Sequence, residues 1–221
     1  MFSPSVILRP ALTLRRGFFY RVAGKRLLDI AACLALAPFV LPIIALAWLA
    51  ARLQGGPAFF AQERVGQGGA TFRCYKLRTM VPDAEARLAR LCARDPRLAA
   101  EWRTYQKLRD DPRVTPLGRL LRRTSLDELP QLWNVLRGDM SLVGPRPFTI
   151  EQESLYRAAG GSHYYSLRPG LTGPWQVSAR GKTTFAERVR FDRAYSAALS
   201  PRTDLRLLLR TVRVVLRANG H

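Results

Sequence analysis

The chain has 221 residues, 48% of them hydrophobic, and a net charge of +20 from 36 basic and 16 acidic residues. This length and composition exclude a disordered chain and allow one domain with a sizeable core and an appendage. The positive charge predicts an anionic partner, whether a nucleic acid, an anionic lipid or a phosphorylated substrate. The three cysteines lie far apart and there are only two histidines, so we expect neither a disulfide framework nor a zinc site.

An uncharged run of 22 residues, 30–51, lies near the N-terminus, and basic residues flank it on both sides. The run is long enough to cross a bilayer as a helix. Pro38 and Pro42 lie in its middle, and each removes a backbone donor and favours a break or bend. The positive-inside rule places both basic flanks on the cytoplasmic side. We therefore expect a re-entrant helix-break-helix anchor, with one kinked spanning helix as the alternative.

The rest of the chain predicts a mainly α-helical fold with one small β-hairpin and surface amphipathic helices. Two short runs on either side of the glycine-rich turn 66–69 predict the hairpin, and prolines and glycines separate the helical segments. We expect strands at 58–65 and 71–78, and helices at 82–95, 96–108, 117–123, 126–137, 151–159 and 203–218. The chain is expected to divide into a basic tail (1–24), the membrane segment (25–55) and a compact cytoplasmic domain (56–221).

The last expected helix, 203–218, has a two-sided pattern. Arginines recur at steps of three and four residues on one side, and leucines and valines form the other. A basic amphipathic helix of this kind can lie on an anionic membrane surface. The equal alternative is a solvated face over a protein core. The arginines are Arg206, Arg210, Arg213 and Arg217, and the apolar residues are Leu205, Leu208, Leu209, Val212, Val215 and Leu216.

An acidic pair, Asp127–Glu128, stands in this basic chain at the expected start of the helix 126–137. Taken alone, the pattern Ser125-x-x-Glu128 favours a structural capping box, in which serine and glutamate each satisfy the other's backbone N–H. The preceding Arg122 and Arg123 change this interpretation, because neighbouring cations keep a carboxylate ionised. An ionised carboxylate can hold Mg²⁺ or attack phosphorus as a nucleophile. Successive helical positions point about 100° apart, so the two acids can have different roles.

Two arginines in Gly- and Pro-containing loops, Arg146 and Arg168, add to this pattern. Proline fixes the backbone and glycine allows close approach, so such loops can present a guanidinium to a phosphate. Each arginine alone is most simply a surface charge. Together with the acidic pair and a membrane segment, they favour phosphate chemistry at a membrane.

These residues belong to longer motifs that resemble the bacterial sugar transferase family, the small monotopic phosphoglycosyl transferases. The resemblance covers about 25–217, and its motifs in this order are highly specific. They are 25–29 (KRLLD), 72–80 (FRCYKLRTM), 122–147 (RRTSLDELPQLWNVLRGDMSLVGPRP) and 168–177 (RPGLTGPWQV).

The resemblance implies a re-entrant anchor with its break at Pro38 and an additional bend at Pro42. It also implies that Asp127 is the nucleophile, that a phosphosugar-enzyme intermediate forms with release of UMP, and that polyprenyl phosphate then attacks this intermediate. Asp127 would bind Mg²⁺ beside the diphosphate, with Glu128 as base or support. The basic positions implied near the phosphates and nucleotide are Arg122, Arg146, Arg168, Lys76 and Arg180.

The subgroup is most similar to members that initiate exopolysaccharide synthesis. This implies UDP-galactose or UDP-glucose as donor, undecaprenyl phosphate as acceptor, and a catalytic domain on the cytoplasmic face of the bacterial inner membrane, in contact with anionic lipids. A homo-oligomer is compatible with the sequence. The segment Ala179-Arg180-Gly181 departs from the Gly-Arg-Asn or Gly-Arg-Ser usual in the family, which leaves the local loop and the sugar preference open.

Two other classes compete with an enzyme. A nucleic-acid-binding protein would explain the charge, but the chain has no recognisable zinc finger or RNP motif and the apolar run is hard to reconcile with it, so we expect no nucleic acid. A non-catalytic membrane scaffold of the same fold remains the second alternative, and the intact acidic pair argues against it.

Overall fold

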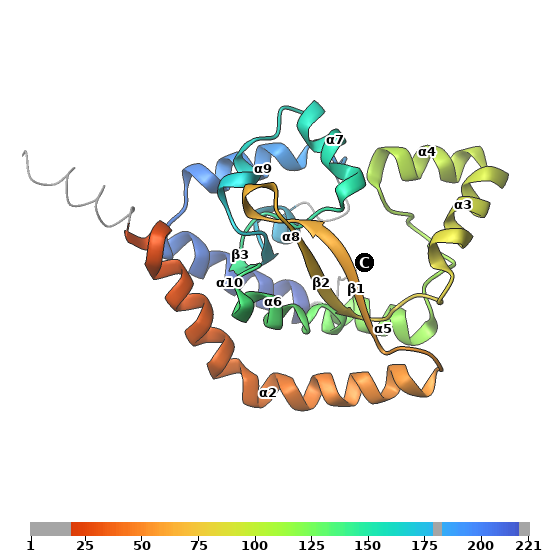
Figure 1. Ribbon diagram of the computed structural model, residues 1–221, viewed down its shortest axis with the longest axis horizontal. Helices are drawn as coiled ribbons and strands as arrows, with labels where there is room; N and C mark the ends of the chain where they lie inside the picture. Colours follow the sequence, from red (N-terminus) through yellow and green to blue (C-terminus); the bar gives the residue numbers. More distant parts are fainter. Residues whose placement is uncertain (1–18, 179–182, 217–221) are drawn as a thin grey trace, which may run out of the picture.

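The computed structural model describes residues 19–178 and 183–216. It is mainly helical, with two small two-stranded sheets (Figure 1). The helices are α2 (Lys25–Leu53), α3 (Ala84–Arg94), α4 (Pro96–Tyr105), α5 (Pro116–Thr124), α6 (Gln131–Arg137), α7 (Ile150–Ala158), α8 (Pro174–Ser178), α9 (Arg188–Ala197) and α10 (Pro201–Leu216). The strands are β1 (Phe59–Val65), β2 (Thr71–Leu77), β3 (Ser141–Val143) and β4 (Gly170–Thr172).

The hairpin expected from the sequence is confirmed. β1 and β2 pair antiparallel, with Phe59 opposite Leu77 and Val65 opposite Thr71. Gly68 and Gly69 have positive φ angles of 71° and 85°, a conformation that glycine adopts without steric cost, so the chain can reverse here. The parallel pair β3 and β4, which brings Val143 opposite Thr172, was not expected from the sequence.

The helix expected at 126–137 is interrupted, which is a correction. Residues Leu126–Glu128 form a single 3₁₀ turn (η4), and α6 begins only at Gln131. Pro130 explains the break because it has no N–H for a continuous hydrogen-bond ladder but is tolerated at a helix start.

The capping box that the Ser125–Glu128 pattern favours when taken alone does not form. Ser125 has φ 58°, in the left-handed region, where its N–H bonds the carbonyl of Arg122 and ends α5. An N-cap residue needs an extended backbone, so Ser125 cannot cap η4. A capping box forms instead at Thr149 and Gln152, at the start of α7.

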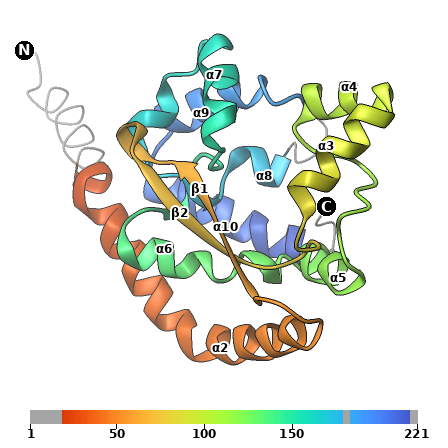
Figure 2. The ribbon, with the colours of Figure 1, turned by 45° about the vertical axis from the view of Figure 1, so that its right-hand side comes forward.

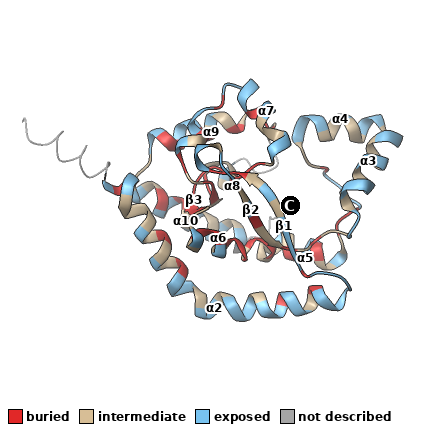
Figure 3. Ribbon diagram, in the orientation of Figure 1, coloured by how far each residue is buried: buried red, intermediate tan, exposed pale blue. Residues whose placement is uncertain are grey.

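The buried hydrophobic residues form three clusters, two of which hold the segment that follows β3, and Figure 3 colours the buried positions red. One joins α2, β2, α6 and α9 through buried residues that include Cys33, Cys74, Val135 and Tyr195. The other is aromatic, and the Phe148 ring lies 4.9 Å from Tyr156 and 4.4 Å from Tyr164 between centroids. Residues 144–147 are therefore fixed between two packed regions.

The helical stretch Tyr20–Leu53 is long and apolar enough to cross a membrane, by length and composition. It begins with a π-helical turn, Tyr20–Gly24, and continues as α2. The helix break expected at Pro38 is not seen, because α2 stays helical across both Pro38 and Pro42, and the helix is instead bent, as Figure 1 shows. Its middle is exposed, with Phe39 at 72% and Leu46 at 70%.

Both ends of α2 bind the rest of the protein. Near the first end, Asp29 is buried and accepts a hydrogen bond from the Leu142 N–H at 2.9 Å. Near the other end, Ala51 is buried and its carbonyl accepts from Arg78 at 3.2 Å.

The helices α3 and α4 pack on each other at one edge of the molecule (Figure 2). The Arg113 guanidinium lies 5.4 Å from the Trp102 ring, and the Phe185 N–H reaches the Thr104 carbonyl at 3.4 Å. These contacts join the pair to the body of the protein.

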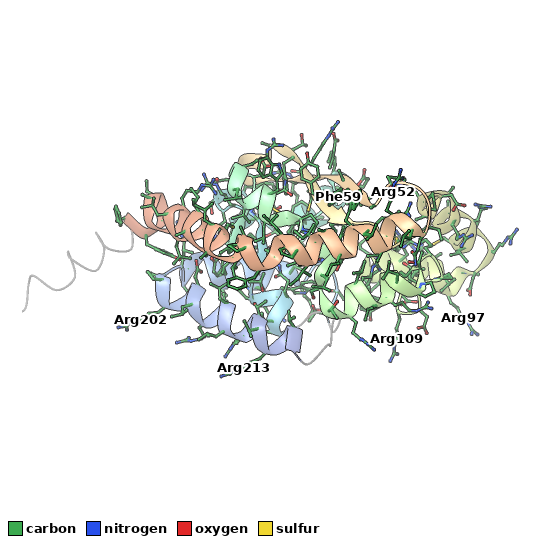
Figure 4. The ribbon with its side chains drawn as sticks, turned by 90° about the horizontal axis from the view of Figure 1, so that it is seen from below. Arg52, Phe59, Arg97, Arg109, Arg202 and Arg213 are labelled. Carbon is green, nitrogen blue, oxygen red and sulfur yellow. The ribbon has the colours of Figure 1, made fainter. Side chains whose placement is uncertain are left out.

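The surface of α10 differs from the two-sided pattern expected. Leu205, Leu209 and Val212 are exposed rather than packed, while the inward face carries Asp204 and Leu207. The outward side therefore carries an apolar stripe beside an arginine stripe. Figure 4 shows Arg202 and Arg213 pointing outward along one edge of the protein.

Candidate active site

The acidic pair lies in η4, the short turn between α5 and α6, and both residues are buried, at 6% and 7% exposure for Asp127 and Glu128. The left-handed Ser125 ends α5 on one side, and Pro130 delays α6 on the other. Local sequence thus places two carboxylates on a tight turn with little freedom to move.

The Glu128 carboxylate is held by two cations from different elements. Lys76 Nζ of β2 lies 2.7 Å from Glu128 Oε1, and Arg146 Nη2 of the segment after β3 lies 2.8 Å from the same oxygen. Burial alone would lower the pKa of Arg146, but the Glu128 carboxylate raises it overall. Glu128 therefore fixes two positive charges at one place.

The Asp127 carboxylate is differently placed. In the described part of the chain it makes no hydrogen bond or ion pair, although Lys76, Arg122 and Arg146 all act on it electrostatically. Burial raises the pKa of Asp127, and Glu128 adds to the rise, while the three cations oppose it. Asp127 is thus a carboxylate close to several cations with its oxygens available.

Arg122 completes the basic surroundings of the pair. Its Nε donates to the Thr79 hydroxyl at 2.9 Å, which fixes the guanidinium at the end of α5. Burial lowers the pKa of Arg122, and Asp127 opposes this effect. The group stays protonated because an arginine starts far above neutrality.

A small pocket adjoins Glu128, and several of its lining residues could not be recognised from the sequence. Arg64 reaches it from β1, while Gln131 reaches it from α6. Burial raises the pKa of the lining thiol, Cys74, which favours its neutral and unreactive form. The pocket is lined by Arg64, Cys74, Lys76, Glu128, Gln131, Arg146 and Pro147.

Two expected phosphate ligands are not brought into this group. Arg168 donates from Nε to the Gly138 carbonyl at 2.9 Å, at the far end of α6. The seven residues of α6 separate it from Glu128 by about 10 Å of helix. Arg180 lies outside the described residues.

The donor set fits a metal shared with a substrate. The described residues contain no group of three acidic, His or Cys side chains that could hold an ion. Mg²⁺ usually takes one or two protein carboxylates and completes its shell with substrate phosphates and water. Asp127, with free oxygens beside Glu128, meets that requirement.

Comparison with known proteins decides the family. A family model described as bacterial sugar transferase matches residues 20–218. The chain belongs to this family. The resemblance expected from the sequence motifs is therefore confirmed, and so is the mainly helical fold.

Several curated relatives of this chain are named as sugar-phosphate transferases or exopolysaccharide proteins. An undecaprenyl-phosphate galactose phosphotransferase of Salmonella typhimurium is 44% identical over 89% of this chain and 41% of its own length. The exopolysaccharide production protein ExoY of Sinorhizobium fredii is 42% identical over 88% of this chain and 84% of its own. A UDP-glucose:undecaprenyl-phosphate glucose-1-phosphate transferase of Caulobacter vibrioides is 45% identical over 91% of this chain and 74% of its own length. The chain spans about two fifths of the Salmonella relative.

Proposed function

We propose that this protein transfers hexose-1-phosphate from a UDP-hexose to undecaprenyl phosphate and releases UMP, as a first membrane step of exopolysaccharide synthesis. The names of the relatives support galactose or glucose as the sugar. One observation carries the proposal: Glu128 is held by Lys76 and Arg146, whereas Asp127, beside it, keeps its oxygens available.

In the first step, an Asp127 carboxylate oxygen attacks the phosphorus that bears the sugar. A bond forms between aspartate and this phosphorus, the bond to the bridging oxygen breaks, and UMP leaves with the electron pair. In the second step, an oxygen of undecaprenyl phosphate attacks the same phosphorus and releases the Asp127 carboxylate. The product is undecaprenyl-diphosphate-hexose, and no external oxidant or reductant is needed.

The cations around the pair have a defined task in this scheme. Phosphoryl transfer is catalysed mainly by positioning and by stabilising charge on the phosphate oxygens. Lys76 and Arg146 are pre-arranged by Glu128, so they need little reorganisation when the diphosphate binds. In this proposal Glu128 supports the cations rather than accepting a proton.

The proposal includes Mg²⁺, which Asp127 would hold with Glu128 nearby. When bound, the ion would neutralise part of the negative charge of the diphosphate. The protein residues bind and orient the donor, and their burial keeps water away from the reactive carboxylate.

The location of the site suits a lipid acceptor. Ala47, in the second half of α2, packs in one buried cluster with Leu77 and Leu121. Leu77 follows Lys76 in the sequence, and Leu121 precedes Arg122. A polyprenyl phosphate in the membrane could therefore reach the acidic pair along α2.

The contacts of α2 support the re-entrant anchor. A straight helix of 29 residues is about 44 Å long, so a spanning helix would place its far end beyond the bilayer. Here Asp29 and Ala51, near opposite ends, both bind the same domain while the middle is exposed. We propose that both ends lie on the cytoplasmic side of the inner membrane.

The outward side of α10 supports contact with anionic lipids. Its exposed apolar stripe can enter the interface while arginines meet lipid phosphates, each adding about 1 kcal/mol. Arg206→Gln with Arg210→Gln should reduce stimulation of turnover by anionic lipid, whereas Arg87→Gln with Arg90→Gln on α3 should not. If anionic lipid stimulated the turnover of both double variants equally, this proposal would be wrong.

The function is tested by UMP release from a panel of UDP-sugars by detergent-purified protein with undecaprenyl phosphate and Mg²⁺. We expect turnover with UDP-galactose or UDP-glucose, and its loss in Asp127→Asn. Turnover only with N-acetylated sugars would overturn the donor assignment. Silence across the panel in folded protein would favour the non-catalytic scaffold.

A further inference from the structure

Arg188, the first residue of α9, is buried at 6% exposure, although it lies outside the acidic site. Its guanidinium lies over two aromatic rings, 5.0 Å from the centroid of Trp175 and 5.0 Å from that of Phe185. Among the described residues no carboxylate lies within ion-pair distance of it. A buried arginine without such a partner costs free energy, so the arrangement calls for a specific reason.

The reason lies in the hydrogen bond that Arg188 makes. Its Nη2 donates to the backbone carbonyl of Arg146, whose own guanidinium binds Glu128 at 2.8 Å. Other carbonyls of this segment are also held, and the Pro147 carbonyl accepts from Arg64 Nη1 at 3.5 Å. The Pro145 carbonyl accepts from the Gly170 N–H at 2.8 Å, and the Phe148 carbonyl accepts from the Val65 N–H at 3.0 Å. Arg188 therefore supplies the side-chain contact that fixes the backbone at Arg146 itself.

We infer that Arg188 is a positioning residue, which sets the backbone of residues 144–148 so that Arg146 meets Glu128 and the donor diphosphate. The role of the donor diphosphate in this inference rests on the proposed function. The effect of Arg188 on the backbone of 144–148 does not depend on that function.

Two further contacts make Arg188 suited to this task. Trp175, one of these two aromatic residues, donates from Nε1 to the Thr183 hydroxyl at 2.9 Å, so α8 and the turn before α9 are joined at the same place. Asp192, one helical turn further along α9, attracts Arg188 electrostatically and accepts from the Tyr156 hydroxyl at 2.9 Å. Burial lowers the pKa of Arg188 to about 10, so it remains a charged donor at neutral pH.

The chemistry of the side chain predicts which substitutions matter. Arg188→Met keeps the length and apolar contact but loses the donor. Arg188→Lys keeps a charge but loses the planar guanidinium that lies over the rings and donates in a fixed direction. Arg190→Met on the same helix is the matched control, because the Arg190 side chain is 72% exposed.

Amide hydrogen exchange gives a readout that does not depend on activity. In Arg188→Met we expect faster exchange in peptides covering 144–148, with exchange in helix α3 (Ala84–Arg94) unchanged. In Arg190→Met we expect no change in either region. Unchanged exchange at 144–148 would overturn the inference. General acceleration in all peptides would also overturn it, because Arg188 would then support the whole fold.

A double-mutant cycle on UMP release tests the link to Arg146. We expect Arg188→Met to reduce kcat/KM by about 100-fold, as small misplacements of catalytic groups do. Arg188→Lys should recover part of this loss. In the Arg146→Met background the same change should cost less than about threefold, because its target is gone. If Arg188→Met still reduced kcat/KM about 100-fold in the Arg146→Met background, the inference would be overturned. If the wild-type protein released no UMP but Arg188→Met still showed faster exchange at 144–148, the proposed function would be overturned and the positioning role would stand.

Discussion

Asp127 and Glu128 are consecutive residues with opposite surroundings. The Glu128 carboxylate accepts from Lys76 and Arg146 at 2.7 and 2.8 Å, whereas within the described residues the Asp127 carboxylate accepts no hydrogen bond. This division follows from the turn η4, which ends α5 before the pair and delays α6 after it. It separates a carboxylate that organises cations from one that can react.

Neutralising Glu128 tests this separation through pH. Ionised Glu128 raises the pKa of Asp127, so Glu128→Gln should lower that pKa and leave Lys76 and Arg146 to lower it further. The acid limb of UMP release should therefore move to lower pH, while the maximal rate falls about 10- to 100-fold as the cations lose their partner. An acid limb that does not move would contradict the electrostatic coupling of the two residues.

Asp192 predicts a pH dependence of stability. Burial raises its pKa from 3.8 to about 6, against the effects of Arg188 and Tyr156. Between about pH 4 and 6 the folded protein keeps this proton and the unfolded chain has lost it, so the free energy of unfolding falls as pH rises. The effect corresponds to about 3 kcal/mol.

Asp192→Asn removes this titration and should flatten the profile. The melting temperature of the variant relative to wild type should rise as pH increases from 4 to 7, as measured by thermal unfolding in detergent. A difference that stays constant over this range would show that Asp192 ionises as an ordinary aspartate.

Asp204 links the beginning of the apolar helical stretch Tyr20–Leu53 to the rest of the protein. It is 1% exposed and lies 2.5 Å from Lys25 and 2.7 Å from the hydroxyls of Tyr20 and Tyr195. Asp204→Ala leaves Lys25 without this partner, and breaking a buried pair costs about 3–5 kcal/mol. We expect the melting temperature to fall by roughly 10 °C.

The control for this change is Asp83→Ala, since the Asp83–Arg90 pair is 51% and 63% exposed. Exposed pairs contribute at most about 1 kcal/mol, so its melting temperature should barely change. Equal effects of the two substitutions would contradict the structural role of Asp204.

The topology of α2 can be measured by cysteine labelling. Cys33 and Cys74 are buried, so replacing Cys92 by Ser leaves a background in which Val22→Cys and Gln54→Cys can be labelled selectively. In intact spheroplasts, an impermeant maleimide should label neither position, and after permeabilisation it should label both. Labelling of just one position in intact cells would establish a spanning helix instead.

Much of the fold could be predicted from local patterns. The two short runs on either side of residues 66–69 form β1 and β2, and Pro96 begins α4 as expected. The Ser125 pattern misled because a capping box and the left-handed end of a preceding helix share the same residue types. Sequence spacing does not reveal which helix end a serine belongs to.

The acidic pair could be found from its motif, but its surroundings could not. Arg64 lies outside the quoted motifs, and Cys74 and Gln131 lie inside them without a pattern that marks them as site residues. All three join the site through tertiary packing. Arg188 was missed for the same reason, because its contact with Arg146 spans 42 residues. Arg168, in contrast, has the expected loop motif but binds the Gly138 carbonyl.

The most direct test of the central claim is to incubate the protein with UDP-galactose or UDP-glucose and Mg²⁺ without any acceptor lipid. We expect release of about one UMP per active protein and an adduct of one hexose phosphate, mapped by mass spectrometry to Asp127 and absent in Asp127→Asn. UMP release that requires undecaprenyl phosphate, with no adduct on Asp127 at any time, would contradict this claim and indicate direct transfer from donor to acceptor.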